Sequence, residues 1–85
     1  MSKRYFVYIL QCSDTTLYTG WTTDIAARIK AHSEGKGARY TKGRGPLTLV
    51  FQQETETKRD ALKLEAYIKR LKRSEKLTYI EEMKK

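Results

Sequence analysis

The sequence contains few of the residues that cross-link a small fold. Its 85 residues include one cysteine, Cys12, and one histidine, His32. A disulfide within the chain needs two cysteines, and a structural zinc site usually takes several cysteine and histidine ligands, so the composition argues against both. A single cysteine also suits a reducing compartment, and we therefore expect a cytoplasmic location.

Long apolar segments are absent as well. The apolar run at residues 5–10 is six residues long, and no small-residue cleavage site follows it. This pattern predicts a β-strand rather than a secretory signal. A membrane-spanning helix needs about 20 apolar residues, so we expect no association with a membrane.

Acidic residues are scarce beside basic ones. The chain has 18 Lys and Arg against 10 Asp and Glu, a formal net charge of +8. Such an excess favours a polyanionic partner, most often nucleic acid, although it also serves solubility alone. The basic residues are spread along the chain, which argues against a disordered basic tail.

The chain length and the hydrophobic patterning predict one α/β (α+β) domain over residues 1–85. A domain of this size buries about 60% of the surface that its unfolded chain exposes, which leaves room for one modest core. Strands are expected at 4–12, 17–21 and 47–53, and helices at 24–34, 58–73 and 75–84. The order ββαβαα implies a small three-stranded mixed sheet with helices packed on it.

Polar residues before the expected helices are candidate N-caps. Thr23 or Asp24 precedes the first helix, and Thr57 and Asp60 open the long one. Ser74 is the expected cap of the last, short helix.

The turn between the first two strands decides how Tyr8 and Tyr18 are related. A two-residue loop would place these tyrosines on opposite faces of the sheet. A three-residue loop, 13–15, would place both on one face with Gly20 opposite Tyr8, so that no side chain crowds the phenol. We favour the three-residue loop because it explains a glycine inside a strand.

Polar residues lie on the borders of the apolar faces of both larger helices. Arg28 and His32 are one turn apart in the first helix, where the alternatives are a surface arginine beside a packed histidine or a shared site. Glu65 borders the apolar stripe of the long helix. It is either the partner of Lys69 in a surface ion pair or a carboxylate aimed at a shared pocket.

The segment 35–46 holds four of the five glycines and the only proline, which predicts a loop. It lacks the phosphate-loop motif and precedes a strand, so we exclude a nucleotide-binding loop. Either it is a solvated connector or it rests on a nucleic-acid backbone. The candidate contacts are Arg39, Tyr40, Lys42 and Arg44.

These residues together resemble a known family. The sequence "VYI" at 7–9, "YTG" at 18–20, Arg28 in the next helix and Glu65 in a later helix are similar to the GIY-YIG nuclease domain. The resemblance covers about residues 4–73. With His32 and the glycine-rich loop, the chain looks most like the small stand-alone bacterial GIY-YIG proteins. Those resemble the catalytic subunit of structure-specific junction and flap endonucleases, which implies a part in DNA repair.

The resemblance implies a metal and a proton acceptor. Glu65 would bind one Mg²⁺ or Mn²⁺ ion, and one carboxylate with waters and a phosphate oxygen is an ordinary Mg²⁺ environment. Tyr8 would order the attacking water or take its proton. Because an unperturbed phenol has a pKa near 10, this role needs a cationic or metal-bound setting that favours the phenolate.

The same resemblance assigns the remaining residues to the phosphate. Tyr18 would hydrogen-bond to the nucleophile or the phosphate, and Arg28 would hold the pentavalent phosphate with a forked pair of donors. His32 would accept or relay a proton. Gly20 would let the backbone pack closely beneath the phosphate.

The chain departs from the family pattern at three positions. Val7 replaces a motif glycine and Thr19 a motif isoleucine, and both substitutions suit a strand. Trp21 stands where many members carry a lysine that would contact phosphate, which leaves Lys42 and Arg44 as candidate replacements.

These features predict a metal-dependent endonuclease that hydrolyses phosphodiester bonds in DNA. It would be guided by nucleic-acid shape, branched or single-stranded, or by a protein partner, rather than by sequence. The alternatives are a nucleic-acid-binding module that cleaves poorly or not at all, and an accessory subunit of a larger enzyme.

Overall fold

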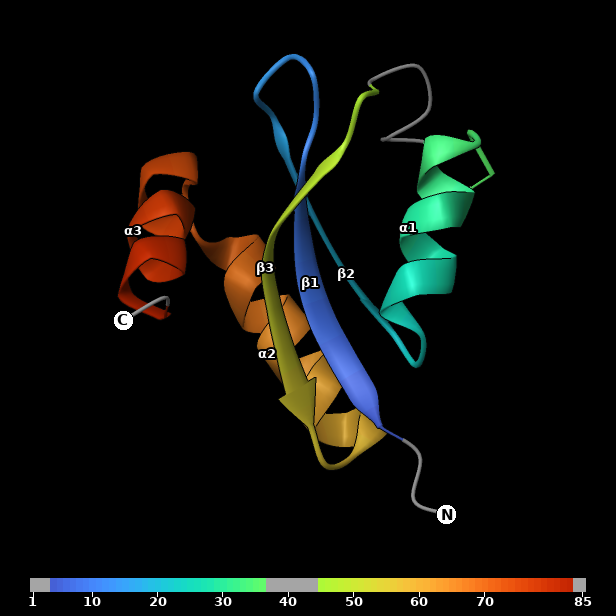
Figure 1. The fold of residues 1–85 in the computed structure, drawn as a ribbon. Coiled ribbons are helices and arrows are strands. Elements are labelled where there is room, and N and C mark those ends of the chain that lie inside the picture. The colour runs from blue at the N-terminus through green and yellow to red at the C-terminus, as the bar shows by residue number, and fades with distance from the viewer. Residues whose placement is uncertain (1–3, 37–44, 84–85) are drawn as a thin grey trace.

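The fold places three helices around a small sheet. A computed structural model describes residues 4–36 and 45–83, so the candidate contacts Arg39, Tyr40, Lys42 and Arg44 lie outside the described residues. The elements follow the expected order ββαβαα (Figure 1). They are β1 Tyr5–Gln11, β2 Leu17–Thr22, α1 Ile25–Ser33, β3 Thr48–Thr55, α2 Lys58–Arg70 and α3 Arg73–Met83.

The sheet is antiparallel throughout, so the expectation of a mixed sheet is wrong. Its strand order is β2-β1-β3, and β1 pairs antiparallel with both neighbours. The strands β2 and β3 run in the same direction, but they lie on opposite sides of β1 and never pair. After α1 the chain therefore returns to the sheet on the free side of β1, where β3 pairs, and not beside β2.

The hairpin has the three-residue loop. The Cys12 amide donates to the Thr16 carbonyl at 2.9 Å, and the Thr15 amide donates back to the Cys12 carbonyl at 2.9 Å. Thr15 takes a left-handed backbone conformation with φ 67°, which turns the chain into β2. The Asp14 carboxylate accepts from the Thr16 amide at 3.2 Å and supports the turn. Tyr8 consequently pairs with Gly20, as the sequence predicted.

The helix caps are confirmed for α1 and α2 but not for α3. Asp24 accepts from the Ala27 amide at 3.0 Å, and Thr57 accepts from the Asp60 amide at 3.1 Å. The last helix begins at Arg73, so Ser74 lies inside it and is not its cap. Instead Glu75 reaches back and accepts from the Lys72 amide at 2.7 Å, which satisfies a free donor at the helix start.

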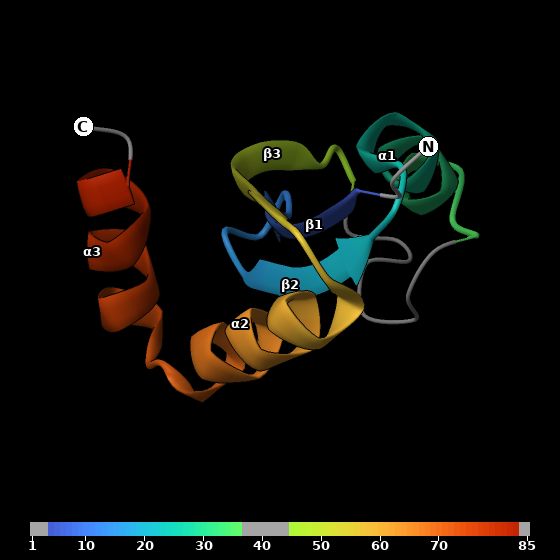
Figure 2. The same cartoon turned by 90° about the horizontal axis from the view of Figure 1, so that it is seen from below.

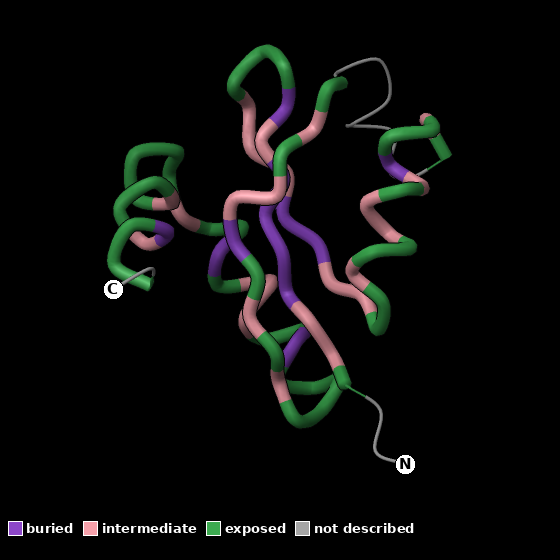
Figure 3. The backbone as a smooth tube through the Cα atoms, in the orientation of Figure 1, coloured by how far each residue is buried: buried purple, intermediate pink, exposed green. Residues whose placement is uncertain are grey.

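One face of the sheet carries the hydrophobic core. Val7 and Ile9 of β1 are fully buried against α2, where they pack with Ala61 and Ile68 of that helix. The other core members are Phe51 of β3 and Ile80 of α3. Figure 2 shows α2 running beneath the sheet, and Figure 3 shows the buried segments gathered along its strands. Among the described residues no helix has the length and apolar character needed to cross a bilayer.

The chain turns sharply between the last two helices. The extended backbone of Leu71 ends α2 at Arg70, three residues earlier than the hydrophobic pattern predicted. The turn brings α3 beside β3, where the rings of Phe51 and Tyr79 lie 5.4 Å apart. The short connection thus closes the core at the β3 edge.

Candidate active site

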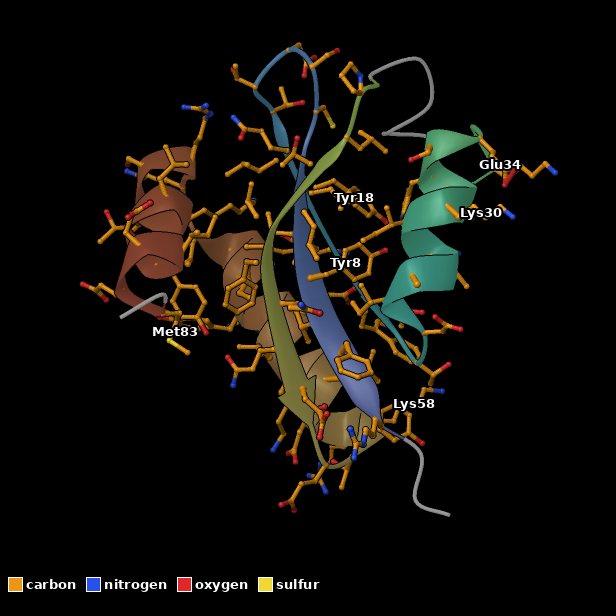
Figure 4. All side chains as sticks on the ribbon, viewed as in Figure 1. Tyr8, Tyr18, Lys30, Glu34, Lys58 and Met83 are labelled. Carbon is orange, nitrogen blue, oxygen red and sulfur yellow. The ribbon has the colours of Figure 1, made fainter. Side chains whose placement is uncertain are left out.

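The second face of β1 carries a buried polar cluster. Side chains alternate along a strand, so the residue between Val7 and Ile9 points away from the core. That residue is Tyr8, and its side chain points toward α1 together with Tyr18 (Figure 4). Tyr8 is 1% exposed, and His32 of α1 is 2% exposed. A phenol and an imidazole therefore share a closed space between the sheet and α1.

Hydrogen bonds join Tyr8 to both polar residues of α1. The Tyr8 oxygen lies 2.9 Å from Nε2 of His32, and Arg28 Nε donates to the same oxygen at 3.4 Å. A guanidinium can only donate, so the phenol oxygen accepts from Arg28 and its own proton is available to His32. If the phenol donates that proton to His32, Nε2 is the acceptor nitrogen of the ring. The predicted pairing of Arg28 and His32 on one helix border is therefore present.

Burial favours the neutral forms of Tyr8 and His32. Burial raises the pKa of the Tyr8 phenol, and the Arg28 hydrogen bond offsets part of that rise. Burial lowers the pKa of His32, and the Arg28 charge lowers it further. The hydrogen bond to Tyr8 raises the pKa of Arg28. The cationic neighbour expected for Tyr8 is thus in place, but desolvation outweighs it in the free protein.

Tyr18 completes the aromatic lining of this face. Its ring lies 5.3 Å from the His32 ring and 6.4 Å from the Tyr8 ring, measured between centroids. Tyr18 and Arg28 are half-buried, whereas Tyr8 and His32 are buried. A ligand approaching this face would therefore meet Tyr18 and Arg28 first.

Gly20 is required by the close approach of the Tyr8 phenol. A Cβ atom at Gly20 would lie 2.6 Å from the Tyr8 oxygen and 2.8 Å from its Cζ atom. No side chain fits between the phenol and the β2 backbone. This geometry confirms the reason predicted for the glycine, while its role beneath a phosphate stays a prediction.

Glu65 lies on α2, which packs on the other face of the sheet, and the structure shows only a charge influence on the site. Its negative charge is among the influences that raise the pKa of Tyr8. Its side chain is 18% exposed, and Lys69 Nζ lies 3.7 Å from one carboxylate oxygen. The predicted surface ion pair is therefore present, but its carboxylate is largely buried and its charge still acts on the phenol.

A divalent ion fits this carboxylate only as a single-ligand site. The described residues contain no group of three or more His, Cys, Asp or Glu side chains able to hold a metal by themselves. Mg²⁺ commonly keeps several waters and uses one or two carboxylates together with substrate phosphates. A partly buried Glu65 that supplies one carboxylate suits that donor set.

Trp21 lies on the core side of β2, away from Tyr8. It packs against the core and lies 6.3 Å from the ring of Tyr5. The ammonium of Lys58, which the sequence did not single out, lies 5.4 Å from the centre of its indole ring. Lys58 thus places a cation next to Trp21, the position where many family members carry a lysine. No local sequence pattern marks Lys58, because its contact with Trp21 depends on tertiary packing.

A shallow pocket opens beside Arg28. It has a volume of about 360 Å³ and is lined by Trp21, Thr22, Thr23 and Arg28. The pocket lies between the end of β2 and the start of α1. An anion bound there would contact the Arg28 guanidinium, next to the cluster of Tyr8 and His32.

Comparison with known proteins identifies relatives of the whole chain. The chain is 55% identical to a UPF0213 protein of Clostridium perfringens, over 88% of this chain and 81% of the relative. It is 44% identical to the UPF0213 protein YazA of Bacillus subtilis, over 95% and 82%.

Two solution NMR structures share the fold. A UPF0213 protein from Bacillus halodurans matches with a TM-score of 0.62 and 45% identity, covering 92% of this chain and 83% of that one. A protein from E. faecalis matches with a TM-score of 0.68 and 34% identity, covering 95% and 86%.

The family model agrees with these relatives and with the geometry. The model that describes the GIY-YIG catalytic domain matches residues 4–79. This span includes the tyrosine pair, both polar residues of α1 and the carboxylate of α2. The chain therefore belongs to the GIY-YIG catalytic domain family.

Proposed function

We propose that this protein is a metal-dependent endonuclease that hydrolyses phosphodiester bonds in DNA, guided by structure rather than by sequence. The observation that carries the proposal is the Tyr8 oxygen, which is hydrogen-bonded between Arg28 and His32 on a GIY-YIG domain. A phenol, an imidazole and a cation thus meet at one oxygen atom, and these are groups that can move a proton and bind a phosphate in phosphodiester hydrolysis.

Arg28 would bind the scissile phosphate. Its contact with Tyr8, 3.4 Å, is at the long limit of a hydrogen bond and is easily exchanged for a charged acceptor. A phosphate in the pocket lined by Trp21 and Arg28 would draw the guanidinium outward. The half-buried Tyr18 would donate a hydrogen bond to the phosphate or to the attacking water.

Tyr8 and His32 would carry the proton of the attacking water. The movement of Arg28 toward the phosphate would uncover the Tyr8 oxygen, which is almost fully covered in the free protein. Because burial holds the pKa of Tyr8 up and that of His32 down, the phenol enters the reaction protonated and the imidazole neutral. Tyr8 would take the proton from water as it passes its own proton to His32 Nε2.

Glu65 would hold the metal ion. When bound, Mg²⁺ or Mn²⁺ polarises the phosphate and offsets the charge on the leaving oxygen. Lys69, whose ammonium lies 3.7 Å from the carboxylate, would have to release Glu65 for it to serve as a metal ligand. The Glu65 carboxylate would exchange its ion pair with Lys69 for the metal ion.

A second candidate function is a nucleic-acid-binding module that cleaves poorly or not at all. The observation that favours it is the 1% exposure of Tyr8, since a group that touches the attacking water must be reached by it. The net charge of +8 supports binding under either function.

Cleavage of defined DNA substrates separates the two functions. The purified protein would be incubated with plasmid, flap, fork and junction DNA, with Mg²⁺ or Mn²⁺ and again with EDTA. Metal-dependent nicking is expected, faster on branched substrates. Glu65→Gln removes the charge with little change in shape, and it should abolish nicking while salt-dependent binding persists.

The matched control is Glu56→Gln, which removes the same charge from an exposed residue before α2. This variant should cleave as the unmodified protein does. If Glu65→Gln also keeps full activity, the cleavage comes from a contaminant and the binding module is the correct function.

A further inference from the structure

The outward side of α2 carries a positively charged surface that the proposed reaction does not use. We name this surface the basic face of α2. It consists of Arg59, Leu62, Lys63, Tyr67 and Arg70, all of them exposed. Ala61 and Ile68, on the inward side of the same helix, are fully buried against the sheet. Lys58 stands at the N-terminal end of this face (Figure 4).

The cations of the basic face form one line along the helix. Arg59, Lys63 and Arg70 are spaced at i, i+4 and i+11, which places them on the same side of an α-helix. They span about 16 Å of helix axis, a length over which duplex DNA presents about ten phosphates. Within residues 4–36 and 45–83, the structure shows no ion pair for these three side chains.

The acidic residues of α2 lie away from this line. Asp60 is in the first turn, where Thr57 caps its amide, and Glu65 is paired with Lys69. The uncompensated charge of the basic face therefore faces solvent. A protein partner would meet two large apolar side chains, Leu62 and Tyr67, beside three cations, whereas a phosphate backbone would meet all three cations as donors.

The basic face is separate from the candidate active site. The cluster of Tyr8 and Tyr18 lies between the sheet and α1 (Figure 4), while α2 packs on the opposite face of the sheet. The outward side of α2 points away from both. One straight segment of duplex could not easily lie along both surfaces, but two arms of a branched nucleic acid could.

We propose that the basic face of α2 is a second nucleic-acid-binding surface, which contacts phosphates of a strand or arm other than the one at Tyr8. The contact is electrostatic and independent of base sequence. The inference concerns binding, which can be measured without metal, so it stands apart from the proposed cleavage.

Salt-dependent binding tests this surface directly. Fluorescence anisotropy in EDTA would measure the affinity for a labelled linear duplex and for a four-way junction over a range of salt concentrations. Lys63→Gln with Arg70→Gln should reduce the magnitude of the slope of log K against log salt by about 2, since each lost phosphate contact contributes about 0.9. The loss of affinity should be larger for the junction than for the duplex.

The matched control is Lys30→Gln with Lys76→Gln, which removes the same charge from α1 and α3. Lys30 points away from the sheet (Figure 4). This control should change the slope much less. Thermal unfolding of both variants would establish that they are folded. Equal losses of affinity and slope in the two variants would overturn the proposal. An unchanged slope for the α2 variant would also overturn it, and would indicate that the basic face binds a partner other than nucleic acid.

Discussion

The two faces of the sheet use the same strand in opposite ways. On one face Val7 and Ile9 of β1 are buried against α2 in an apolar core. On the other, Tyr8 is equally buried but is held by Arg28 and His32 of α1. Adjacent residues of one strand thus face the core and the candidate site separately, since successive side chains point to opposite faces. Burial by itself therefore does not distinguish a core residue from a residue of the candidate site in a domain this small.

The largest effect on stability should come from the core face. Ile68→Ala removes a fully buried side chain, and the free energy of unfolding should fall by about 2–5 kcal/mol. Leu62→Ala, on the outward side of the same helix at 42% exposure, should cost about 0.5 kcal/mol or less. Urea unfolding of both variants measures the difference. Equal losses would show that α2 does not pack as described.

Gly20→Ala should disturb the packing around Tyr8 and should lower the free energy of unfolding less than Ile68→Ala does. The new methyl group would lie 2.6 Å from the Tyr8 oxygen, so the phenol or the β2 backbone must shift and the hydrogen bond to His32 is disturbed. Overpacking of this kind costs about 1–3 kcal/mol. Gly45→Ala is the control, because a Cβ atom there meets nothing within 4 Å. Urea unfolding should show a loss for Gly20→Ala alone, and a fully stable Gly20→Ala variant would contradict the close packing of the phenol.

The site face should also make stability depend on pH. His32 has a lowered pKa in the folded protein, so below about 6.5 the unfolded chain binds a proton that the folded chain resists. Stability should therefore fall as the pH drops from 7.5 to 5.5. His32→Gln, which keeps an acceptor for Tyr8, should show less of this fall. Thermal melts at both pH values measure it, and identical pH dependence in the two proteins would exclude His32 as its source.

The smallest effect is expected at Lys69, an exposed residue of α2 that pairs with Glu65. Lys69→Gln removes an ion pair worth a few tenths of a kcal/mol, so stability should hardly change. If Glu65 holds the metal, losing its competitor should tighten Mn²⁺ binding roughly twofold. Titration of Mn²⁺ in the absence of DNA measures this change. Weaker Mn²⁺ binding would place the ion elsewhere.

Local sequence signals predicted most of the fold. Hydrophobic patterning gave the element order, and side-chain oxygens marked the caps at Asp24 and Thr57. The sequence left two hairpin registers open because the choice depends on Thr15 adopting a positive φ. The mixed sheet was a wrong prediction, since the sequence does not encode locally which strand β3 pairs with. Ser74 was wrong because Glu75 competes for the free amide.

The candidate site was predictable as a set of residues but not as a geometry. Spacing put Arg28 and His32 on one border of α1, and the structure shows that docking of this helix buries His32 against Tyr8. The near-complete burial of Tyr8 and the cation of Lys58 over Trp21 depend on tertiary packing alone. The roles assigned to these residues stay predictions.

The most direct test of the central claim compares two tyrosines of the same strand. Tyr8 belongs to the site face, and Tyr5 packs beside the core on the other. Single-turnover cleavage of a flap or junction substrate with Mg²⁺ would be measured for Tyr8→Phe and Tyr5→Phe. We predict a loss of about 10²-fold or more for Tyr8→Phe and near-normal cleavage for Tyr5→Phe. Normal cleavage by Tyr8→Phe would contradict the assignment of this face as an active site.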